Sequence, residues 1–396
     1  MNSAVSPIQN SEEAKEVLFH PELLQKFDIN GPRYTSYPSA DRFHQDFSQA
    51  DYLGALTRVA KQSEPLSLYF HLPFCPNICY YCGCNKIITK DHGRSAKYIK
   101  YLAKEMAMVT KAMGSQGKIP VTQLHWGGGT PTFLSHEEMQ ELMHHTKEHF
   151  ELLPGGEYSI EIDPRRVSEE DIALLAELGF NRISLGVQDF NLAVQEAVHR
   201  IQTIEETQAV MDWSRKYGFK SRSVDLIYGV PGETLEQWES TVKTALSYGL
   251  NHLSAYSLIV EPNTKLANQI SRGEISKPDD DLAAEMYLAV DELATGKNLD
   301  WYELSNWGEP AKHNLVYWRN ENWWGLGPGA HSHLDGVRWW NVKHPNTYKA
   351  KLDSFESPML DREILTADQI RDETIMLQLR LREGLDLSKL PESKIN

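Results

Sequence analysis

The sequence contains little cysteine and no long apolar run. Only four cysteines occur in 396 residues, and all of them lie between Cys75 and Cys84. A disulfide scaffold distributes its cysteines along the chain to close loops, so this clustering argues against a scaffold and indicates metal or cluster chemistry. No stretch approaches the roughly 20 apolar residues of a membrane-spanning helix. The N-terminus, MNSAVSPIQN, has neither a basic start nor an apolar core, so we expect no secretory signal and a cytoplasmic protein.

Basic charge is also scarce. Lys and Arg total 40 against 55 Asp and Glu, which gives a formal net charge of −15. Proteins that bind nucleic acids normally present a basic surface, so this balance argues against that class. An anionic small molecule remains compatible, because a local cluster of arginines can oppose the global sign. The hydrophobic content of 41% is ordinary for a globular protein.

Short apolar runs alternate with longer amphipathic stretches. The predicted strands are Ser67–Pro73, Gln123–Gly127, Glu157–Ile162, Arg182–Val187, Ser223–Tyr228 and His252–Ile259. The predicted helices between them include Tyr98–Met113, His136–His149, Glu169–Leu178 and Ile204–Tyr217. Strand–helix units in succession predict an α/β fold with a parallel sheet and functional residues at the carboxyl ends of its strands. Six units are too few for a closed eight-stranded barrel, so we expect an open partial (β/α)6 barrel.

The flanking segments differ from this pattern. We expect three parts: residues 1–55 as an N-terminal arm and helical lead-in, residues 56–265 as the barrel, and residues 266–396 as a mixed, aromatic-rich region that ends in helix. Seven of the ten tryptophans lie in this last part: Trp301, Trp307, Trp318, Trp323, Trp324, Trp339 and Trp340. They are expected to close the open side of the barrel. The alternative is a wall that stacks on a planar macrocycle.

The cysteines follow the first predicted strand directly, in the segment Cys75-Pro-Asn-Ile-Cys79-Tyr-Tyr-Cys82-Gly-Cys84. Cys75, Cys79 and Cys82 can each bind one iron of a [4Fe–4S] cluster, which leaves the fourth iron open to a small-molecule ligand. The alternative is a four-cysteine zinc site. Structural zinc sites usually draw two pairs of ligands from separated segments, which this loop lacks.

This CxxxCxxC segment resembles the signature of the radical SAM enzymes, including the aromatic Tyr81 before the third cysteine. The resemblance implies that the open iron binds S-adenosylmethionine. One electron from the cluster then cleaves a carbon–sulfur bond and yields a 5′-deoxyadenosyl radical, while the protein supplies binding, orientation and exclusion of water.

The resemblance also implies a set of S-adenosylmethionine contacts. Gly127-Gly128-Gly129-Thr130-Pro131, after the second strand, resembles the family motif for the methionyl amino group, and Glu161 resembles the residue that binds the ribose hydroxyls. A glycine-rich strand end by itself also fits a simple tight turn. The implied cofactor-binding residues are Tyr69, Gly128, Gly129, Thr130, Glu161, Gln188, Arg200, Asp225, Ile259 and His331.

About the first 230 residues resemble the oxygen-independent coproporphyrinogen III oxidases. The matching segments are GPRYTSYP (Gly31–Pro38), the loop with its fourth cysteine Cys84, QLHWGGGTP (Gln123–Pro131), VQDF (Val187–Phe190) and DLIYG (Asp225–Gly229). In that family the radical abstracts hydrogen from a propionate, and loss of CO₂ and an electron leaves a vinyl group, twice per substrate. The resemblance implies catalytic roles for Cys84, Arg33 and Tyr69. Arg33 suits a substrate with four carboxylates. The alternative role for Arg33 is a structural salt bridge.

Later segments resemble the related radical SAM heme chaperones instead. These are WYELSN (Trp301–Asn306), HNLVYW (His313–Trp318) and GLGPGAHS (Gly325–Ser332). The oxidases normally carry a longer C-terminal helical domain, so the chain has the pattern of a hybrid with its junction near Asp225–Pro231. His313 is then a candidate axial heme ligand, because neutral imidazole binds iron. The alternative is a packed, hydrogen-bonded histidine.

We therefore expect a coproporphyrinogen oxidase in heme biosynthesis, with a heme chaperone as the alternative. The expected cofactors are a [4Fe–4S] cluster and S-adenosylmethionine, with heme in the alternative. The expected partners are a tetrapyrrole substrate or heme and an electron donor such as flavodoxin or ferredoxin. Neither a nucleic acid nor a membrane span is expected.

Overall fold

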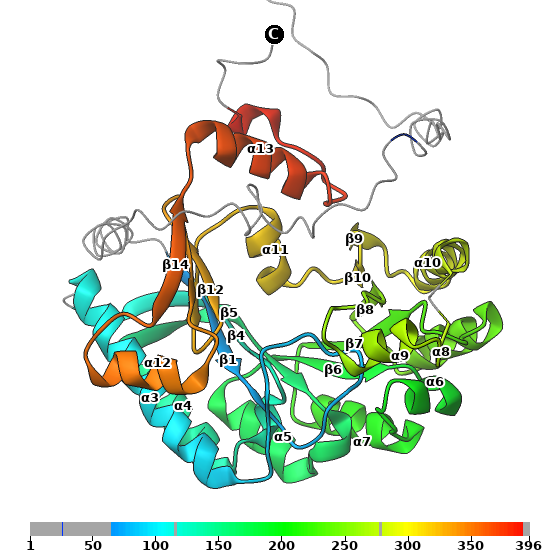
Figure 1. Cartoon of the computed structure of the whole chain (residues 1–396), viewed down its shortest axis with the longest axis horizontal. Coiled ribbons are helices and arrows are strands. Elements are labelled where there is room, and N and C mark those ends of the chain that lie inside the picture. The colour runs from blue at the N-terminus through cyan, green and yellow to red at the C-terminus, as the bar shows by residue number, and fades with distance from the viewer. Residues whose placement is uncertain (1–25, 27–64, 115–116, 277–278, 391–396) are drawn as a thin grey trace, which may run out of the picture.

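Six parallel strands joined by helical crossovers form the centre of the computed structural model (Figure 1). The structure describes Lys26 and residues 65–114, 117–276 and 279–390. The strands, in their order across the sheet, are β1 (Leu66–Leu72), β4 (Ile119–Gly128), β5 (Phe150–Ile162), β6 (Arg182–Gln188), β7 (Ser221–Tyr228) and β8 (His252–Ser257). Apart from Lys26, the predicted arm of residues 1–55, with Arg33 and Gly31–Pro38, lies outside the described residues.

The crossover helices begin at clear sequence signals. They are α3 (His92–Met113), α4 (His136–His149), α5 (Glu169–Leu178), α6 (Leu192–Ala197), α7 (Ile204–Lys216) and α8 (Leu235–Ser247). In α4, α5, α7 and α8 a Ser or Thr caps the first turn, and the residue three positions later returns a hydrogen bond to the cap. These capping boxes satisfy N–H groups that have no partner within the helix.

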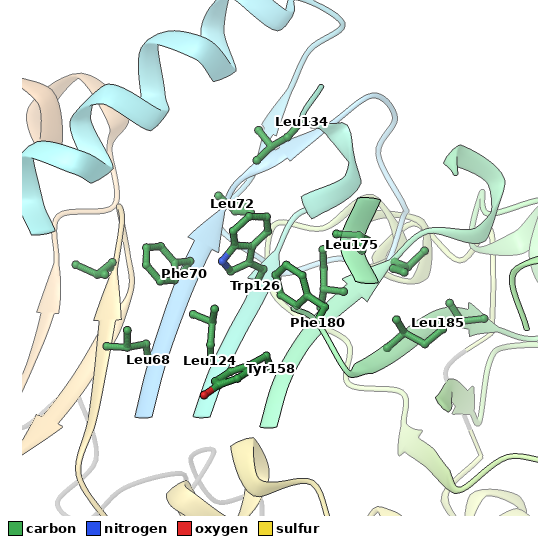
Figure 2. Packing of buried hydrophobic residues seen from close by; sticks show 14 of the residues in the cluster. Leu68, Phe70, Leu72, Leu124, Trp126, Leu134, Tyr158, Leu175, Phe180 and Leu185 are labelled. Carbon is green, nitrogen blue, oxygen red and sulfur yellow. The ribbon is translucent and has the colours of Figure 1, made fainter. Parts of the chain in front are cut away.

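The central strands alternate between apolar and polar side chains. Leu68, Phe70, Leu124 and Trp126 point to the side covered by helices, where Trp126 packs edge-on against Phe180 with ring centroids 4.8 Å apart (Figure 2). The alternate residues of the six central strands face the barrel interior, and most are polar: Ser67, Tyr69, His71, Gln123, His125, Ser159, Glu161, Ser184, Ser223, Asp225 and Ser254. Because side chains alternate with period two, one face builds the hydrophobic core and the other lines the site.

Further strands extend the sheet at both edges and leave it open. Beyond β1 lie β11 (Trp323–Leu326), β12 (His331–Leu334), β13 (Val337–Asn341) and β14 (Met359–Ile364), and beyond β8 lie β10 (Asn306–Gly308) and β9 (Trp301–Glu303). β11 pairs parallel with β1, and the other added strands pair antiparallel. The predicted open, incomplete barrel is confirmed.

The C-terminal helices surround this extended sheet. They are α9 (Lys265–Ser271), α10 (Asp280–Thr295), α11 (Lys312–Trp318), α12 (Pro345–Asp353) and α13 (Ala367–Gln378), followed by a 3-10 turn at Leu387–Lys389. In Figure 1, α11 lies between the two added strand groups. None of the helices in the described part of the chain is long and apolar enough to cross a membrane.

The C-terminal tryptophans are partly core residues. Trp307, Trp324 and Trp339 are buried, and Trp324 packs edge-on against Phe150 of β5. The indole of Trp307 also donates a 2.8 Å hydrogen bond to Asp291 of α10. These three rings therefore attach the added strands to the rest of the fold and do not form a free stacking wall.

A buried carboxyl pair joins the end of β6 to the turn before α8. Asp189 and Glu233 are 1% and 4% exposed, and their side chains hydrogen-bond to each other, which requires a shared proton. Burial and the neighbouring Asp189 raise the pKa of Glu233 well above its usual value. Glu233 also accepts the N–H of Val230 at 3.1 Å. The pair therefore fixes the backbone that follows Gln188.

Glu233→Gln is expected to flatten the pH dependence of stability. With its folded pKa raised, Glu233 contributes stability that is complete below the unfolded pKa of about 4.3 and decreases as the pH rises toward the folded value. The amide introduced by the substitution donates to Asp189 without a shared proton, so the variant should exceed the wild type by about 1 to 3 kcal/mol near pH 8. Denaturant unfolding at several pH values measures this. Parallel profiles would contradict it, and the exposed Glu236→Gln is the control.

Candidate active site

The four cysteines lie in one loop at the carboxyl end of β1. Its base is a two-stranded parallel ribbon formed by β2 (Phe74–Cys75) and β3 (Ile87–Ile88). At its tip the N–H of Tyr80 donates to Val198 O, and Tyr80 O accepts from Leu266 N, both at 3.0 Å. The loop is thus held on both sides by backbone hydrogen bonds that do not involve the thiols.

The sulfur atoms receive polar contacts from surrounding strand ends. The Thr130 hydroxyl donates to Cys75 Sγ at 3.7 Å, and Arg200 Nη1 donates to Cys79 Sγ at 3.5 Å. A hydrogen bond from Cys84 is the main cause that lowers the pKa of Cys82 to about 6, and the same bond raises the pKa of Cys84. Burial raises the pKa of Cys75 to about 11. Donors that stabilise negative sulfur suit a thiolate-ligated cluster.

Across the described residues, no three His, Cys, Asp or Glu side chains form a group that could hold a metal ion. A structural zinc site needs its ligands around one ion. A cubane cluster instead takes each thiolate on a different iron atom. By their spacing, Cys75, Cys79 and Cys82 are the candidate ligands of a [4Fe–4S] cluster.

The glycine triplet after β4 lies tightly against the end of β1. A Cβ on Gly129 would come within 2.7 Å of Phe74 O, and one on Gly128 within 2.5 Å of the His71 ring. Gly128 also has a φ of 108°, which few residues other than glycine adopt. The N–H groups of Gly129 and Thr130 donate to Leu72 O and Phe74 O at 2.9 and 2.8 Å. Only glycine fits here, because any side chain would collide with residues 71–74.

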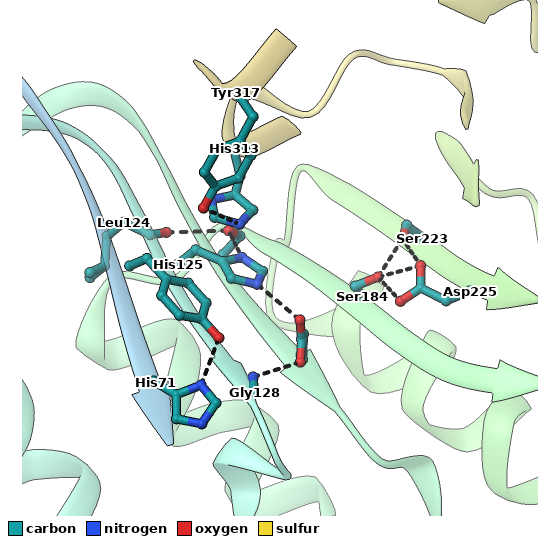
Figure 3. A network of polar contacts seen from close by, with 12 residues as sticks. His71, Leu124, His125, Gly128, Ser184, Ser223, Asp225, His313 and Tyr317 are labelled. Atoms are coloured by element: carbon teal, nitrogen blue, oxygen red, sulfur yellow. Dashed lines mark hydrogen bonds and ion pairs between the residues drawn. The ribbon is translucent and has the colours of Figure 1, made fainter. Parts of the chain in front are cut away.

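Glu161, on the inner face at the end of β5, is held by two donors. Its Oε2 accepts the N–H of Gly128 at 3.1 Å, and its Oε1 accepts from His125 Nε2 at 3.3 Å (Figure 3). Burial by itself would raise the pKa of Glu161, but these donors lower it below its usual value. A carboxylate has about four acceptor positions, so an ionised Glu161 can still accept hydroxyl groups from a ligand.

Arg200 connects the loop to the strand ends. Its guanidinium donates to Gly186 O on β6 from Nε and Nη2, at 3.1 and 2.6 Å, and forms an ion pair with Asp163 at 3.5 Å. Although burial opposes its charge, Asp163 and Cys79 raise the pKa of Arg200, so the group stays cationic. Gln188 ends β6 in the left-handed region, with a φ of 72°. This strand end therefore presents both an amide and a fixed positive charge near Cys79.

The other candidates on the described strands and loops are Asp225, Ile259 and His331. Asp225 lies three residues before the end of β7, where its carboxylate accepts the hydroxyls of Ser184 and Ser223 (Figure 3). Burial raises the pKa of Asp225. Ile259 is 48% exposed after β8, and His331 opens β12 and stacks on Trp340 with ring centroids 5.9 Å apart. Asp225 thus belongs to the polar lining of the barrel, below its rim.

His313 reaches the barrel interior from α11. It stacks on His125 with ring centroids 4.0 Å apart, and Tyr69 stacks on both imidazoles at 5.9 and 5.8 Å. His313 Nε2 lies 3.3 Å from the Tyr317 hydroxyl (Figure 3). Its Nδ1 lies 3.4 Å from Gln123 Nε2. Burial lowers the pKa of His313 well below its usual value. Both ring nitrogens have partners, which favours the packed alternative over heme ligation.

Sequence reasoning did not identify two histidines that contact the candidate site. His125 bonds to Glu161, and His71 bonds to the Tyr69 hydroxyl through Nδ1 at 3.1 Å and to Asn85 O through Nε2 at 2.7 Å. His125 could have been identified from its position along β4. Alternate residues of a strand face the same side, so His125 lies on the inner face together with Gly127.

One pocket of the described structure lies away from the cysteine loop. It measures about 300 Å³ and borders Pro65, Ser67, Thr122 and Gln123, at the amino ends of β1 and β4. The cysteine loop follows the opposite ends of these strands. In parallel α/β sheets, functional residues gather at the carboxyl ends, so the loop and its neighbours remain the candidate site.

Comparisons with known proteins agree with this geometry. The family model described as the Radical SAM superfamily matches residues 69–245. The chain is 48% identical over 238 residues to the oxygen-independent coproporphyrinogen III oxidase of Pseudomonas aeruginosa, across 60% of this chain but only 51% of the relative. It is 36% identical over 332 residues to the heme chaperone HemW of Mycobacterium tuberculosis, across 83% of this chain and 84% of the relative.

A solved structure is also similar to this chain. The coproporphyrinogen III oxidase of Escherichia coli, described as a radical SAM enzyme, matches with a TM-score of 0.82 and 30% identity, across 93% of this chain and 86% of that one. The chain spans about half the length of the curated oxidase that it matches but most of the curated chaperone. It therefore belongs to the radical SAM superfamily, in the family that contains the oxygen-independent coproporphyrinogen III oxidases and the HemW heme chaperones.

Proposed function

We propose that the protein is an oxygen-independent coproporphyrinogen III oxidase, which converts two propionates to vinyl groups and yields protoporphyrinogen IX. The observation that carries the proposal is the convergence of a four-cysteine loop, the glycine triplet and Glu161 at one end of the barrel. Cys84 adds a fourth thiol beside Cys82. The 48% identity to a named oxidase supports the same assignment.

When bound, the [4Fe–4S] cluster and S-adenosylmethionine supply the electron and the 5′-deoxyadenosyl radical that this chemistry requires. Cys75, Cys79 and Cys82 hold the cluster, and Arg200 keeps a positive charge beside Cys79. Glu161 would accept the ribose hydroxyls, and the segment that contains Gly128 and Gly129 would hold the methionyl group. We assign further cofactor contacts to Tyr69, Thr130, Gln188, Asp225, Ile259 and His331, the substrate carboxylates to Arg33, and the electron supply to a flavodoxin or ferredoxin.

The direct test is an anaerobic reaction of the iron-reconstituted protein with dithionite, S-adenosylmethionine and coproporphyrinogen III. Mass spectrometry should detect protoporphyrinogen IX together with 5′-deoxyadenosine. Deoxyadenosine without porphyrin product would contradict the oxidase assignment and retain only the radical chemistry. Absence of both from a protein that contains the cluster would contradict the whole proposal.

Cys84→Ala is expected to retain the cluster and lose oxidation. Three thiols are enough for the proposed cluster, so iron content and visible absorbance should match the wild type. The Cys84 hydrogen bond that lowers the Cys82 pKa is lost, together with a thiol next to the reaction site. We expect porphyrin formation to fall by about tenfold or more. Full activity in the anaerobic assay would show that Cys84 has only a structural role.

A heme chaperone is the second candidate. It is supported by the 36% identity to HemW, which covers 83% of this chain and 84% of that relative, whereas the oxidase match covers 60% of this chain and 51% of its relative. Such a protein would keep the cluster loop, bind heme and deliver it without oxidising coproporphyrinogen.

Heme titration of the purified wild type and of a His313 variant distinguishes the oxidase from the heme chaperone. Because both ring nitrogens of His313 already have partners, we expect any Soret shift produced by added heme to be the same in wild type and His313→Ala. Difference absorbance spectra measure this directly. A Soret shift that disappears in His313→Ala would identify His313 as the axial ligand and favour the chaperone.

A further inference from the structure

His125 links the C-terminal region to the candidate cofactor site. Its Nε2 lies 3.3 Å from Glu161 Oε1, and its Nδ1 lies 2.7 Å from the Ser159 hydroxyl. A carboxylate only accepts hydrogen bonds, so the Nε2–H of His125 donates to Glu161. The contact depends on Gly127, because a Cβ there would lie 2.9 Å from His125 Nε2 and 2.8 Å from Glu161 Oε1. The site is therefore shaped to let this imidazole reach the carboxylate.

The other side of His125 is covered by His313. Their rings stack with centroids 4.0 Å apart and planes 12° apart. Gln123 Nε2 can only donate, so His313 Nδ1 accepts, and its Nε2–H donates to the Tyr317 hydroxyl. The His313 backbone N–H also donates to Glu157 at 3.3 Å. A neutral ring bonded at both nitrogens, on a residue whose backbone is also bonded, thus forms a rigid support for His125.

We propose that His313 and His125 are positioning residues for Glu161: the His313 ring fixes the His125 imidazole, which fixes the carboxylate that binds the ribose of S-adenosylmethionine. This inference rests on the proposed function, which gives Glu161 that ligand. With Oε1 held by His125 and Oε2 by Gly128 N–H, the carboxylate plane is set and lone pairs stay free for a vicinal diol. The segment that resembles the chaperones thereby acts on cofactor binding and not on heme.

The test measures the affinity of the full-length, cluster-reconstituted protein for S-adenosylmethionine by equilibrium dialysis without reductant. His313→Ala should weaken binding by about tenfold, since loss of the stack lets His125 and Glu161 reorient. His313→Phe keeps an aromatic face against His125 and should stay within about threefold of wild type. The exposed neighbour Lys312→Ala is the control and should bind like wild type.

A double-mutant cycle separates positioning from a general structural effect. In a Glu161→Gln background, His313→Ala should weaken binding by less than about twofold, because the carboxylate that it positions is already gone. The inference is overturned if His313→Ala binds normally, or if it loses the same factor with and without Glu161. If the wild type itself does not bind S-adenosylmethionine, the proposed function fails first and the inference fails with it.

Discussion

Replacing Cys79 by alanine is expected to remove the iron–sulfur cluster and all cleavage of S-adenosylmethionine. The loop offers three thiols at the spacing of a cubane site, and Cys79 is the one whose sulfur faces the buried Arg200 guanidinium at 3.5 Å. With one thiolate missing, an iron loses its protein ligand and the cluster loses an anchor. Iron content and visible absorbance should fall to background, and 5′-deoxyadenosine should be undetectable.

The fold should survive this change. The loop tip is held by backbone hydrogen bonds from Tyr80 N to Val198 O and from Leu266 N to Tyr80 O, so circular dichroism and the unfolding midpoint should stay close to wild type. Cys84→Ala is the matched control, because it removes a thiol from the same loop and should retain iron. Unchanged iron content in Cys79→Ala would refute the proposed ligand set.

The central fold was accessible from the sequence because its elements carry local signals. The strands of this barrel have apolar residues at alternate positions, and capped amphipathic helices separate them. The predicted bounds of α4 and α5 match the structure, whereas β5 begins at Phe150 and not at Glu157. Pro154 and two glycines indicate a break there. The strand instead accommodates them with a shift in register against β4.

The added strands could not be predicted in the same way. β11 pairs with β1, although most of the described chain lies between the two strands. The four residues of β11 contain no sequence pattern that predicts which strand they pair with. Such pairing depends on tertiary packing and not on local propensity. Sequence reasoning therefore predicted an aromatic-rich region at the open side but neither its strand order nor its attachment to both edges.

Some residues of the candidate site could likewise be predicted from local sequence, and others could not. The cysteines, Gly128, Gly129 and Glu161 stand next to strand ends, where residue type and position point to the same chemistry. His125 lies one step further back on the inner face of β4, and its importance appears only when β4 and β5 are side by side. The sequence also left His313 between a heme ligand and a packed residue, since only the placement of α11 against β4 shows what its nitrogens contact.

Replacing Glu105 by alanine is expected to give a large loss of stability. Glu105 is a carboxylate of α3 that is 2% exposed and connects the barrel to the C-terminal strands. It accepts hydrogen bonds from Gly327 N at 2.9 Å, Asn341 Nδ2 at 2.6 Å and the Tyr348 hydroxyl at 2.5 Å. Burial is the main cause that raises its pKa to about 7, while these donors oppose the rise.

Alanine leaves two of these donors, Gly327 N–H and the Tyr348 hydroxyl, buried without an acceptor, whereas Asn341 keeps its bond to Gly327 O. Each unsatisfied group costs about 1 to 3 kcal/mol, and the cavity left by the side chain adds to this. We therefore expect Glu105→Ala to lower the free energy of unfolding by about 3 to 5 kcal/mol in denaturant titrations. Tyr348→Phe, which removes only one donor, should cost about 1 to 2 kcal/mol.

The exposed Glu177→Ala on α5 is the control and should change stability by less than about 0.5 kcal/mol. Glu105→Gln keeps one acceptor oxygen, and its loss should fall between those of the alanine variant and the control. Because Gly327 packs directly against the Tyr98 hydroxyl and His71 O, release of this contact should also loosen the end of β1 that carries the cysteine loop. A Glu105→Ala protein as stable as the control would mean that the added strands are held by their apolar contacts alone, and that the carboxylate does not join the two halves of the chain.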